Sequence, residues 1–167
     1  MRFMKSLATL LSPLLVATMA SAGEASAPSQ TGAPLPSLAA SGLQAVQRAV
    51  SIARDRKLQV SVACVDTGGN LVAFARTDDA TLISVDTAIG KAYTAIAFRT
   101  DTATLYRLTR SSQALAGLEH VSREPRNLVM FPGGVLVRQD GYVVGAIGVS
   151  GAPNSADDDA LAQDALR

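Results

Sequence analysis

The chain has 167 residues and a formal net charge of +1, with 15 Lys and Arg against 14 Asp and Glu. This balance gives no reason to expect a nucleic acid or a membrane surface as a partner. A single cysteine excludes an intramolecular disulfide and a multi-cysteine metal site. Tryptophan is absent and aromatic residues make up only 4%. The core must therefore be aliphatic and rich in alanine, which favours helices packed closely on a sheet.

The first 36 residues have the pattern of an export signal followed by a leader. Arg2 and Lys5 precede an apolar run over 7–20, and Ala20-Ser21-Ala22 matches the small-x-small site of signal peptidase. The run is short for a membrane span, which needs about 20 apolar residues. We expect a signal peptide over 1–22, a disordered leader over 23–36 and one folded domain over 37–167. The mature protein is then periplasmic or secreted; a retained N-terminal anchor is the alternative.

The first half of the domain predicts a helix, a β-hairpin and a second helix. Ser37 suits the N-cap of a helix reaching about Lys57, with an apolar stripe at Leu43, Val46, Val50 and Ala53. Residues 58–66 and 71–75 have the composition of two strands around the turn 66–70. The second helix is expected over 82–98. Lys91 lies there among small residues, and we expect a solvated charge, with a site group as the alternative.

The second half predicts a short helix over 102–110, a further turn ending near Gly117-Leu118 and a polar loop over 119–126. Strands are expected over 128–131, 135–138 and 142–149, and a last helix begins near Ala156 and reaches Leu166. Neighbouring strands are joined by hairpins, and no parallel crossover is needed. The expected fold class is α+β, a five-stranded antiparallel sheet covered by helices.

The stretch from Tyr142 to Val149 is expected to be the central strand, because it is almost entirely apolar and rich in Val and Ile. Asp140-Gly141 before it indicates a tight hairpin turn. Gly145 and Gly148 allow a helix, a ligand or a second subunit to approach the backbone closely. We expect the exit Gly148–Gly151 to form the edge of a site.

Several kinds of catalytic or metal site lack the residues they need. Ser150 lies in Gly-Val-Ser-Gly-Ala, which is not the nucleophile elbow, and the only histidine is His120. One His and one Cys far apart fall short of a zinc site. Cys64 is expected to be a small buried hydrophobe. Asp157–Asp159 is better explained as the acidic first turn of a helix than as a cation site.

A pocket for a small anionic ligand remains possible from the residue inventory. His120, Met130, Tyr93 and Tyr106 are side chains that can ligate haem iron. Arginine binds carboxylates through paired hydrogen bonds, and the candidate anion-binding residues are Arg107, Arg110, Arg123 and Arg126. This inventory permits haem without requiring it.

Motifs spread over the whole domain resemble the GlcG/HbpS family of haem-binding proteins. They are Val65-Asp66-x-Gly-Gly-x-Leu-Val-x-Phe-x-Arg76-x-Asp78, Lys91-Ala-x-Thr94-Ala-x-x-Phe98-x-x-x-Thr102, Gly133-Gly134, and Gly145-Ala-Ile-Gly-Val-Ser-Gly-Ala152 before Asp157-Asp158. The resemblance implies a profilin-like α/β/α domain with a five-stranded antiparallel sheet. It also implies homo-oligomers, from dimers to octamers, and binding of haem or a related tetrapyrrole by some members. Other members resemble the C-terminal domain of corrinoid adenosyltransferases or accompany glycolate-utilisation enzymes.

The leading hypothesis is therefore an exported oligomer that binds haem between subunits, near the second helix and the Gly148–Gly151 exit. Its expected cofactor-binding residues are His120, Arg76, Lys91, Arg123, Arg126 and Ser150, with His120 on the metal. A solvated loop histidine is the alternative for His120, and an ion pair with Asp66 or Asp78 is the alternative for Arg76.

Two other hypotheses remain. The chain is an enzyme or an enzyme accessory acting on a small organic acid or aldehyde through Lys91 or the pair Arg76 and Asp78. Otherwise, the same residues serve only folding and assembly.

Overall fold

The computed structural model describes residues 38–111, 117 and 126–167. The expected signal peptide and leader, the turn after Ser111, and the two candidate site residues His120 and Arg123 lie outside the described residues. The elements in chain order are α1 (Leu38–Asp55), β1 (Ser61–Asp66), β2 (Leu71–Arg76), α2 (Leu82–Phe98), α3 (Thr102–Ser111), β3 (Gly134–Gln139), β4 (Tyr142–Ser150) and α4 (Ser155–Ala165).

The sheet is antiparallel, with strand order β2-β1-β4-β3. The expected central strand is confirmed, because β4 lies inside the sheet and is buried from Gly145 to Ser150. The expected turn Asp140-Gly141 joins β3 to β4, and both residues have the positive φ angles of a tight hairpin. Antiparallel α+β architecture is therefore confirmed.

The prediction of five strands is wrong for the described part of the chain, which contains four. Residues 128–131 were expected to form the additional strand, but they do not join the sheet. They cross α2 instead, where the Val129 N–H donates to Thr94 Oγ1 at 2.7 Å. Apolar composition alone did not distinguish a strand from a segment packed on a helix.

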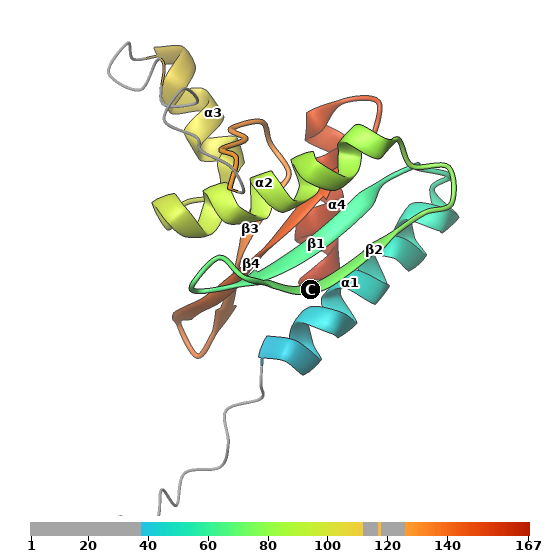
Figure 1. Ribbon diagram of the computed structural model, residues 1–167, viewed down its shortest axis with the longest axis horizontal. Helices are drawn as coiled ribbons and strands as arrows, with labels where there is room; N and C mark the ends of the chain where they lie inside the picture. The colour runs from blue at the N-terminus through green and yellow to red at the C-terminus, as the bar shows by residue number, and fades with distance from the viewer. Residues whose placement is uncertain (1–37, 112–116, 118–125) are drawn as a thin grey trace, which may run out of the picture. The chain divides into compact units, whose positions relative to one another are not determined.

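Helices cover both faces of the sheet (Figure 1). α1 and α4 pack on one face, and their buried aliphatic residues form one core with alternate residues of the strands. α2 packs on β1, β4 and β3 on the other face and forms a smaller core. The three layers agree with the α/β/α arrangement that the sequence resemblance implies. No helix in the described residues is both long and apolar enough to cross a membrane.

The contact between α2 and β4 is unusually close because both elements present small side chains there. A Cβ atom added to Gly148 would collide with the carbonyl oxygen of Ala88 and would lie 2.6 Å from the Ala92 nitrogen. Ala88, Ala92 and Ala95 are fully buried against the sheet. Glycine at this point lets the helix backbone lie almost directly on the strand.

The limits of α1 and α2 follow the sequence closely, although one detail of α1 was wrong. The second helix spans the expected residues 82–98, and α1 ends at Asp55 close to the expected limit. Leu43, expected in the apolar stripe of α1, is 48% exposed, whereas Val46 and Ala53 are fully buried. The buried stripe therefore runs through the residues at positions 45, 46, 49, 50 and 53.

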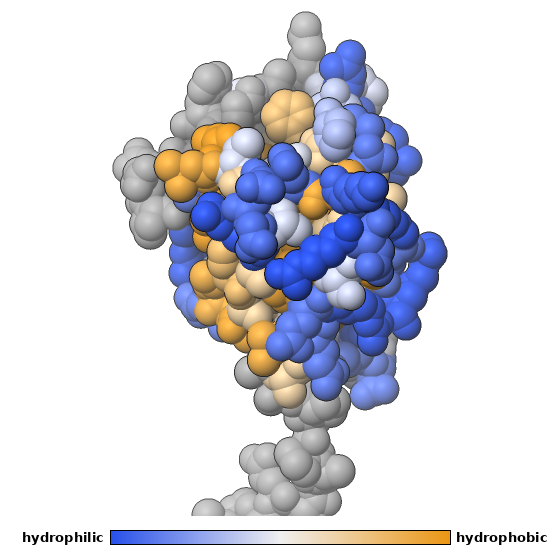
Figure 2. Space-filling view, turned by 90° about the vertical axis from the view of Figure 1, so that its right-hand side faces the viewer, coloured by the Kyte–Doolittle hydropathy of each residue, from blue (hydrophilic) through white to orange (hydrophobic). Residues whose placement is uncertain are grey.

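Apolar side chains remain exposed beside α2. Leu82 and Ile83 at its start are 80% and 66% exposed, and Leu71 and Phe74 of β2 are 50% and 36% exposed. Figure 2 shows that hydrophobic and hydrophilic residues separate into two adjacent zones on one side of the molecule. The α2-side face of β2 stays uncovered, because α2 packs on the other three strands.

Substitution of Gly148 by Ala tests the close contact of α2 with β4. We expect a loss of about 3 kcal/mol or more of unfolding free energy, because the new methyl group meets helix backbone that cannot move without separating the layers. Gly141→Ala is the control, since its Cβ meets nothing within 4 Å and only its positive φ adds strain, about 1 kcal/mol. Urea unfolding measures both. Equal losses in the two variants would contradict the contact.

Candidate functional site

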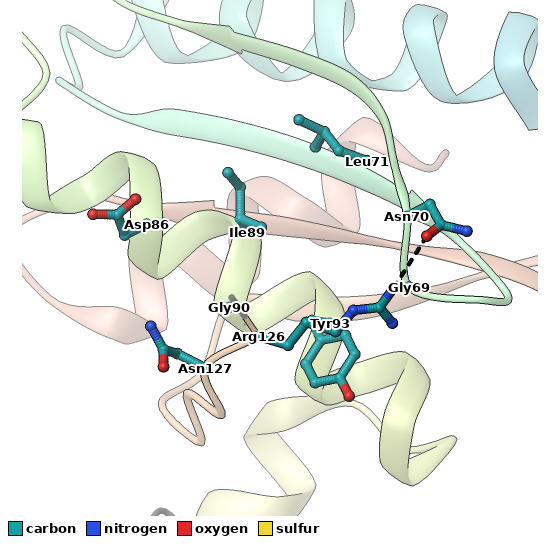
Figure 3. A pocket seen from close by; sticks show the side chains of 9 residues that line it. All are labelled: Gly69, Asn70, Leu71, Asp86, Ile89, Gly90, Tyr93, Arg126 and Asn127. Atoms are coloured by element: carbon teal, nitrogen blue, oxygen red, sulfur yellow. Dashed lines mark hydrogen bonds between the residues drawn. The ribbon is translucent and has the colours of Figure 1, made fainter. Parts of the chain in front are cut away.

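A cavity of about 320 Å³ lies between the tip of the β1–β2 hairpin, the outer side of α2 and the chain at Arg126–Asn127 (Figure 3). Three segments far apart in sequence therefore form its walls. The side chains combine two apolar residues, one aromatic ring, two amides and two opposite charges. Among the residues that the structure describes, the lining is Gly69, Asn70, Leu71, Asp86, Ile89, Gly90, Tyr93, Arg126 and Asn127.

The hairpin tip is held by the carboxylate of Asp66. Its Oδ1 accepts hydrogen bonds from the backbone N–H groups of Gly68 at 2.9 Å and Asn70 at 2.8 Å, and Oδ2 accepts one from Asn70 Nδ2 at 3.1 Å. The hydrogen bonds from Asn70 contribute most to lowering the pKa of Asp66 below its usual value, with a smaller effect of Arg126. The tip of the hairpin is therefore a fixed wall of the cavity.

Arg126 joins the hairpin tip to α2. Its Nη1 donates to the carbonyl oxygen of Gly68 at 2.7 Å, and its Nη2 donates to Asn70 Oδ1 at 3.1 Å. The guanidinium carbon lies 5.3 Å from the centroid of the Tyr93 ring, within the range of a cation–π contact. Figure 3 shows Arg126 extending past Tyr93 toward Asn70. A guanidinium has five N–H groups, so this exposed residue keeps donors for a ligand.

Two glycines allow the walls to come together. Gly69 has a positive φ of 74°, and a Cβ there would lie 2.7 Å from the Tyr93 ring. A Cβ at Gly90 would lie 2.6 Å from Val129 Cγ2 and 3.1 Å from the carbonyl oxygen of Asn127. Side chains at these positions would displace Tyr93 or the Arg126–Asn127 segment. The shape of the cavity thus depends on glycine at both positions.

Thr94 fixes the segment that crosses α2. Its fully buried hydroxyl lies 2.7 Å from the carbonyl oxygen of Gly90 and accepts the Val129 N–H, also at 2.7 Å. The hydroxyl thereby bonds both the helix and the crossing segment. Val129 lies three residues after Arg126, so its bond to Thr94 keeps that arginine next to the hairpin tip.

A model of the family described as "Haem degrading protein HbpS-like" matches residues 39–167. The chain belongs to the HbpS-like family.

Relatives of known name or structure match the same region of this HbpS-like chain. Corrinoid adenosyltransferase PduO of Salmonella typhimurium is 36% identical over 123 residues, which are 74% of this chain but only 36% of PduO. The chain thus spans about a third of that relative. A structure of a PduOC:haem complex has a TM-score of 0.69 and 34% identity, covering 76% of this chain and 90% of the other. A double mutant of Streptomyces reticuli HbpS has a TM-score of 0.67 and 31% identity, covering 92% and 97%.

The expectation that Lys91 is solvated is wrong. Its side chain is only 4% exposed, and its Nζ donates to Asp158 Oδ2 at 2.8 Å and to the carbonyl oxygen of Val149 at 3.0 Å. Burial lowers the pKa of Lys91, and the neighbouring Asp158 carboxylate opposes this effect. Lys91 therefore ties α2 to β4 and α4 inside the protein and does not line the cavity.

The acidic cluster at the start of α4 is confirmed as a helix start, and it also makes specific contacts. Asn154 caps the helix by accepting the Asp157 N–H, and Asp158 Oδ1 accepts the Ala152 N–H at 2.9 Å. Asp159 Oδ1 accepts the Gly133 N–H at 3.2 Å, and burial raises the pKa of Asp159. The described residues contain no group of three or more His, Cys, Asp or Glu side chains arranged to hold a metal ion.

The Gly148–Gly151 exit, which was expected to border a site, does not line the cavity. α2 fills the space over Gly148, and a Cβ on Gly151 would collide with the carbonyl oxygen of Gln59. The Ser150 hydroxyl lies 2.8 Å from the Thr87 hydroxyl and is 9% exposed, so it bonds α2 to β4. These glycines serve close packing, and the cavity lies on the opposite, outer side of α2.

Arg76 is exposed at the end of β2 and does not line the cavity. The expected ion pair with Asp66 is wrong, because the register pairs Arg76 with Ser61 and places the two charges at opposite ends of the hairpin. The described residues also contain no ion pair between Arg76 and Asp78.

The other candidate ligands are dispersed. Of the aromatic and arginine candidates within 38–111 and 126–167, only Tyr93 and Arg126 line the cavity. Tyr106 contacts Phe131 at 5.7 Å between ring centroids, and Arg110 lies over the Tyr106 ring. Arg107 donates to Thr104 within α3. Cys64 is fully buried as expected, and burial raises the pKa of its thiol to about 11.

Sequence reasoning missed most of the cavity wall, which consists of Gly69, Asn70, Leu71, Asp86, Ile89, Gly90 and Asn127. The turn Asp66–Asn70 was recognised, but only as a turn. A signal existed in α2, where Ile89 and Tyr93 are four residues apart and Gly90 breaks a run of larger side chains. These α2 residues form one wall of the cavity only because the distant segment Arg126–Asn127 packs beside them, and no local pattern indicates that contact.

Removal of Asp158 tests the buried ion pair. We expect Asp158→Ala to lose about 3–5 kcal/mol of unfolding free energy, because it leaves the buried Lys91 charge without its partner. The double variant Lys91→Met with Asp158→Leu should recover much of this loss, since no charge remains buried. Urea unfolding at pH 7 measures the set. An Asp158→Ala variant as stable as the natural chain would refute a structural role for the pair.

The pH dependence of Asp158→Asn provides a second test with a definite sign. Without the Asp158 carboxylate, burial is opposed only by the weaker effect of the Asp159 charge and lowers the pKa of Lys91 further below the usual 10.5. Between the folded and unfolded pKa values the unfolded chain binds more protons, so stability rises with pH in that window. We expect this variant to gain unfolding free energy as the pH rises toward about 10, relative to the Lys91→Met and Asp158→Leu double variant. Parallel pH curves would contradict a buried unpaired lysine.

Proposed function

We propose that this HbpS-like chain is exported, associates with copies of itself and binds haem or a related tetrapyrrole. The observation that carries the proposal is the cavity on the outer side of α2, in a chain of this family with 34% identity to the protein of the PduOC:haem complex. Export to the periplasm or the medium is supported by the signal pattern at residues 1–22.

The residues of the cavity suit a flat ligand that is apolar at its centre and acidic at one edge. Leu71 and Ile89 offer aliphatic surface on two different walls. Arg126 is exposed and offers N–H donors to a propionate, and guanidinium–carboxylate bonds are among the stronger hydrogen bonds in proteins. Gly69 and Gly90 keep side chains out of the space between these groups. The group, when bound, supplies an iron centre for ligation or redox chemistry.

The volume of the cavity supports association of subunits. About 320 Å³ is near the lower end of the range for ligand pockets, about 300–1,000 Å³. One subunit therefore encloses only part of a tetrapyrrole. A second copy over the exposed apolar side chains beside α2 would cover the remainder, which agrees with a pocket between subunits.

Among the side chains that can ligate iron, Tyr93 lines the cavity. We propose His120 as the leading candidate for the metal ligand, because it is the only histidine of the chain and follows from the residue inventory. Arg123 is proposed as a further anion-binding residue on the same basis. Met130 is half-buried.

The alternative of an enzyme acting on a small organic acid or aldehyde is weakened, because its main candidate residue, Lys91, is not accessible to a substrate. That hypothesis required a water-reachable pocket around Lys91, and Lys91 is buried in an ion pair with Asp158. Asp78 lines a different shallow cavity near the end of β2, together with Arg54 and Lys57. No observation on the described residues favours catalysis there.

A haemin titration tests the proposal. We expect the purified mature protein to shift and sharpen the Soret band with saturable stoichiometry. Arg126→Ala should weaken haemin binding about tenfold, because it removes a charged hydrogen-bond donor. Arg138→Ala, an exposed arginine on β3, is the matched control and should bind as the natural chain does. A titration without a Soret change would remove the haem proposal, and equal affinity of both variants would remove the site.

Replacement of His120 tests the iron ligand separately. If His120 ligates the iron, His120→Ala changes the absorption spectrum of the bound haem, whereas Tyr93→Phe leaves it unchanged. The opposite result assigns the ligand to Tyr93. If neither variant changes the spectrum, both residues are excluded as ligands, while the binding site tested by Arg126 stands.

A further inference from the structure

The two edges of the sheet differ in how their backbone groups are satisfied. At the β3 edge, the Gly134 N–H donates to Thr102 Oγ1 at 2.8 Å, and the Leu136 N–H donates to Asp101 Oδ1 at 2.9 Å. The Thr102 hydroxyl also lies 3.3 Å from the Gly134 carbonyl oxygen. Side chains at the start of α3 therefore cap this edge, and another strand cannot pair with it at these residues.

The β2 edge carries no such cap in the described part of the chain. The Thr77 N–H donates to the Val60 carbonyl oxygen, so this pair is hydrogen-bonded across the β1–β2 hairpin. Bonded and non-bonded pairs alternate in an antiparallel ladder. The continuous register from Arg76 to Ala73 then directs the N–H and C=O groups of Phe74 and Arg76 away from β1. No described side chain or loop bonds these outward groups.

The side chains of β2 make the open edge prone to associate with another strand. The strand reads Leu-Val-Ala-Phe-Ala-Arg, with its only charge at the last residue. Phe74 is 36% exposed and Leu71 is 50% exposed, both on the side of the sheet that α2 leaves uncovered at β2. Proteins usually protect an edge strand with charges, proline, bulges or a covering element. In β2 such features are confined to its two ends, Arg76 at the last residue and the irregular register near Val72.

We infer that β2 is the self-association surface of this protein, pairing antiparallel with β2 of a second copy about a two-fold axis at Phe74. This inference takes the proposed self-association as given and locates its surface. A two-fold axis perpendicular to the sheet keeps the α2 layers of both copies on the same side. Two Phe74 residues then exchange their outward N–H and C=O bonds, and the sheet becomes continuous through eight strands.

Charge and side-chain matching favour a second copy as the occupant. With Phe74 opposite Phe74, the register sets Arg76 opposite Val72 of the second copy, whose side chain lies on the α1 face, so no like charges meet across the axis. The two Phe74 rings lie on the same side of the sheet as a cross-strand aromatic pair. Arg76 of each copy also comes to the hairpin-tip end of the other, where Leu71 forms part of the cavity wall.

This arrangement gives Arg76 a place beside the proposed haem site. Within one subunit Arg76 does not line the cavity, because it lies at the far end of the hairpin. Antiparallel pairing reverses the strand direction and brings the arginine of one copy toward the cavity of the other. The cavity would then gain a second cation for an acidic ligand from the neighbouring subunit.

The test combines a variant that prevents pairing at the β2 edge with a variant that cross-links the paired strands. Phe74→Lys should reduce the molar mass in solution, measured by light scattering after gel filtration, to half that of the natural assembly, because edge lysines oppose strand pairing. Leu43→Lys, at an exposed leucine on α1, is the control and should keep the natural mass. Circular dichroism checks that both variants are folded.

A disulfide records the pairing directly. Phe74→Cys in a Cys64→Ala background should form a covalent dimer under mild oxidation, because bonded antiparallel pairs have Cα atoms about 5.5 Å apart, within disulfide range. Leu43→Cys in the same background should remain uncross-linked. A natural chain that is monomeric overturns both the association and this surface. An assembly that survives Phe74→Lys, or no cross-link at Phe74→Cys, overturns the surface alone and leaves association to another face.

Discussion

The contact of α2 with β4 is the constraint on which the rest of the structure depends. Gly148 lets the backbone of α2 lie on the strand, and Ala88 and Ala92 fill the space that a side chain would otherwise occupy. The buried pair Lys91 and Asp158 then fixes the helix to β4 and to α4. A lysine charge in an aliphatic interior is stable only with such a partner. The helix consequently has one defined rotation on the sheet.

That rotation determines which groups of α2 are available outside. The small residues face inward, so Asp86, Ile89 and Tyr93 face the hairpin tip and the crossing segment. Thr94 bonds the crossing segment to the helix, and Arg126 closes the distance to the hairpin through Gly68 and Asn70. The same placement leaves the α2-side face of β2 uncovered, because the helix packs on the other three strands. The cavity and the exposed apolar side chains of β2 thus have one structural origin.

The sequence predicted the fold class, the limits of the main helices and the central strand, because these depend on local composition and periodicity. It also predicted a buried Cys64 and a helix start at the acidic cluster. It could not place residues 128–131, since an apolar tetrapeptide suits both a strand and a segment packed on a helix. Lys91 was misjudged for a related reason: its partner Asp158 is 67 residues away, and no local pattern indicates that the two meet.

The same limit applied to the candidate site. Arg126 was predicted from its side-chain chemistry and does line the cavity, whereas Arg76 and Ser150 were drawn from motifs and do not. Glycines near Gly148 suggested a ligand, but they serve the approach of α2. Gly69 and Gly90 likewise allow a close approach, but of the walls of the cavity. Only the packing of three distant segments distinguishes the two groups of glycines.

Hydrogen–deuterium exchange with and without haemin tests whether α2 is closed toward the sheet and open for a ligand on its outer side. We expect slower exchange at residues 68–71, 86–93 and 126–127 when haemin is bound, with no change at 145–151. Slower exchange confined to residues 145–151, or no change in any of these segments at saturating haemin, would contradict it.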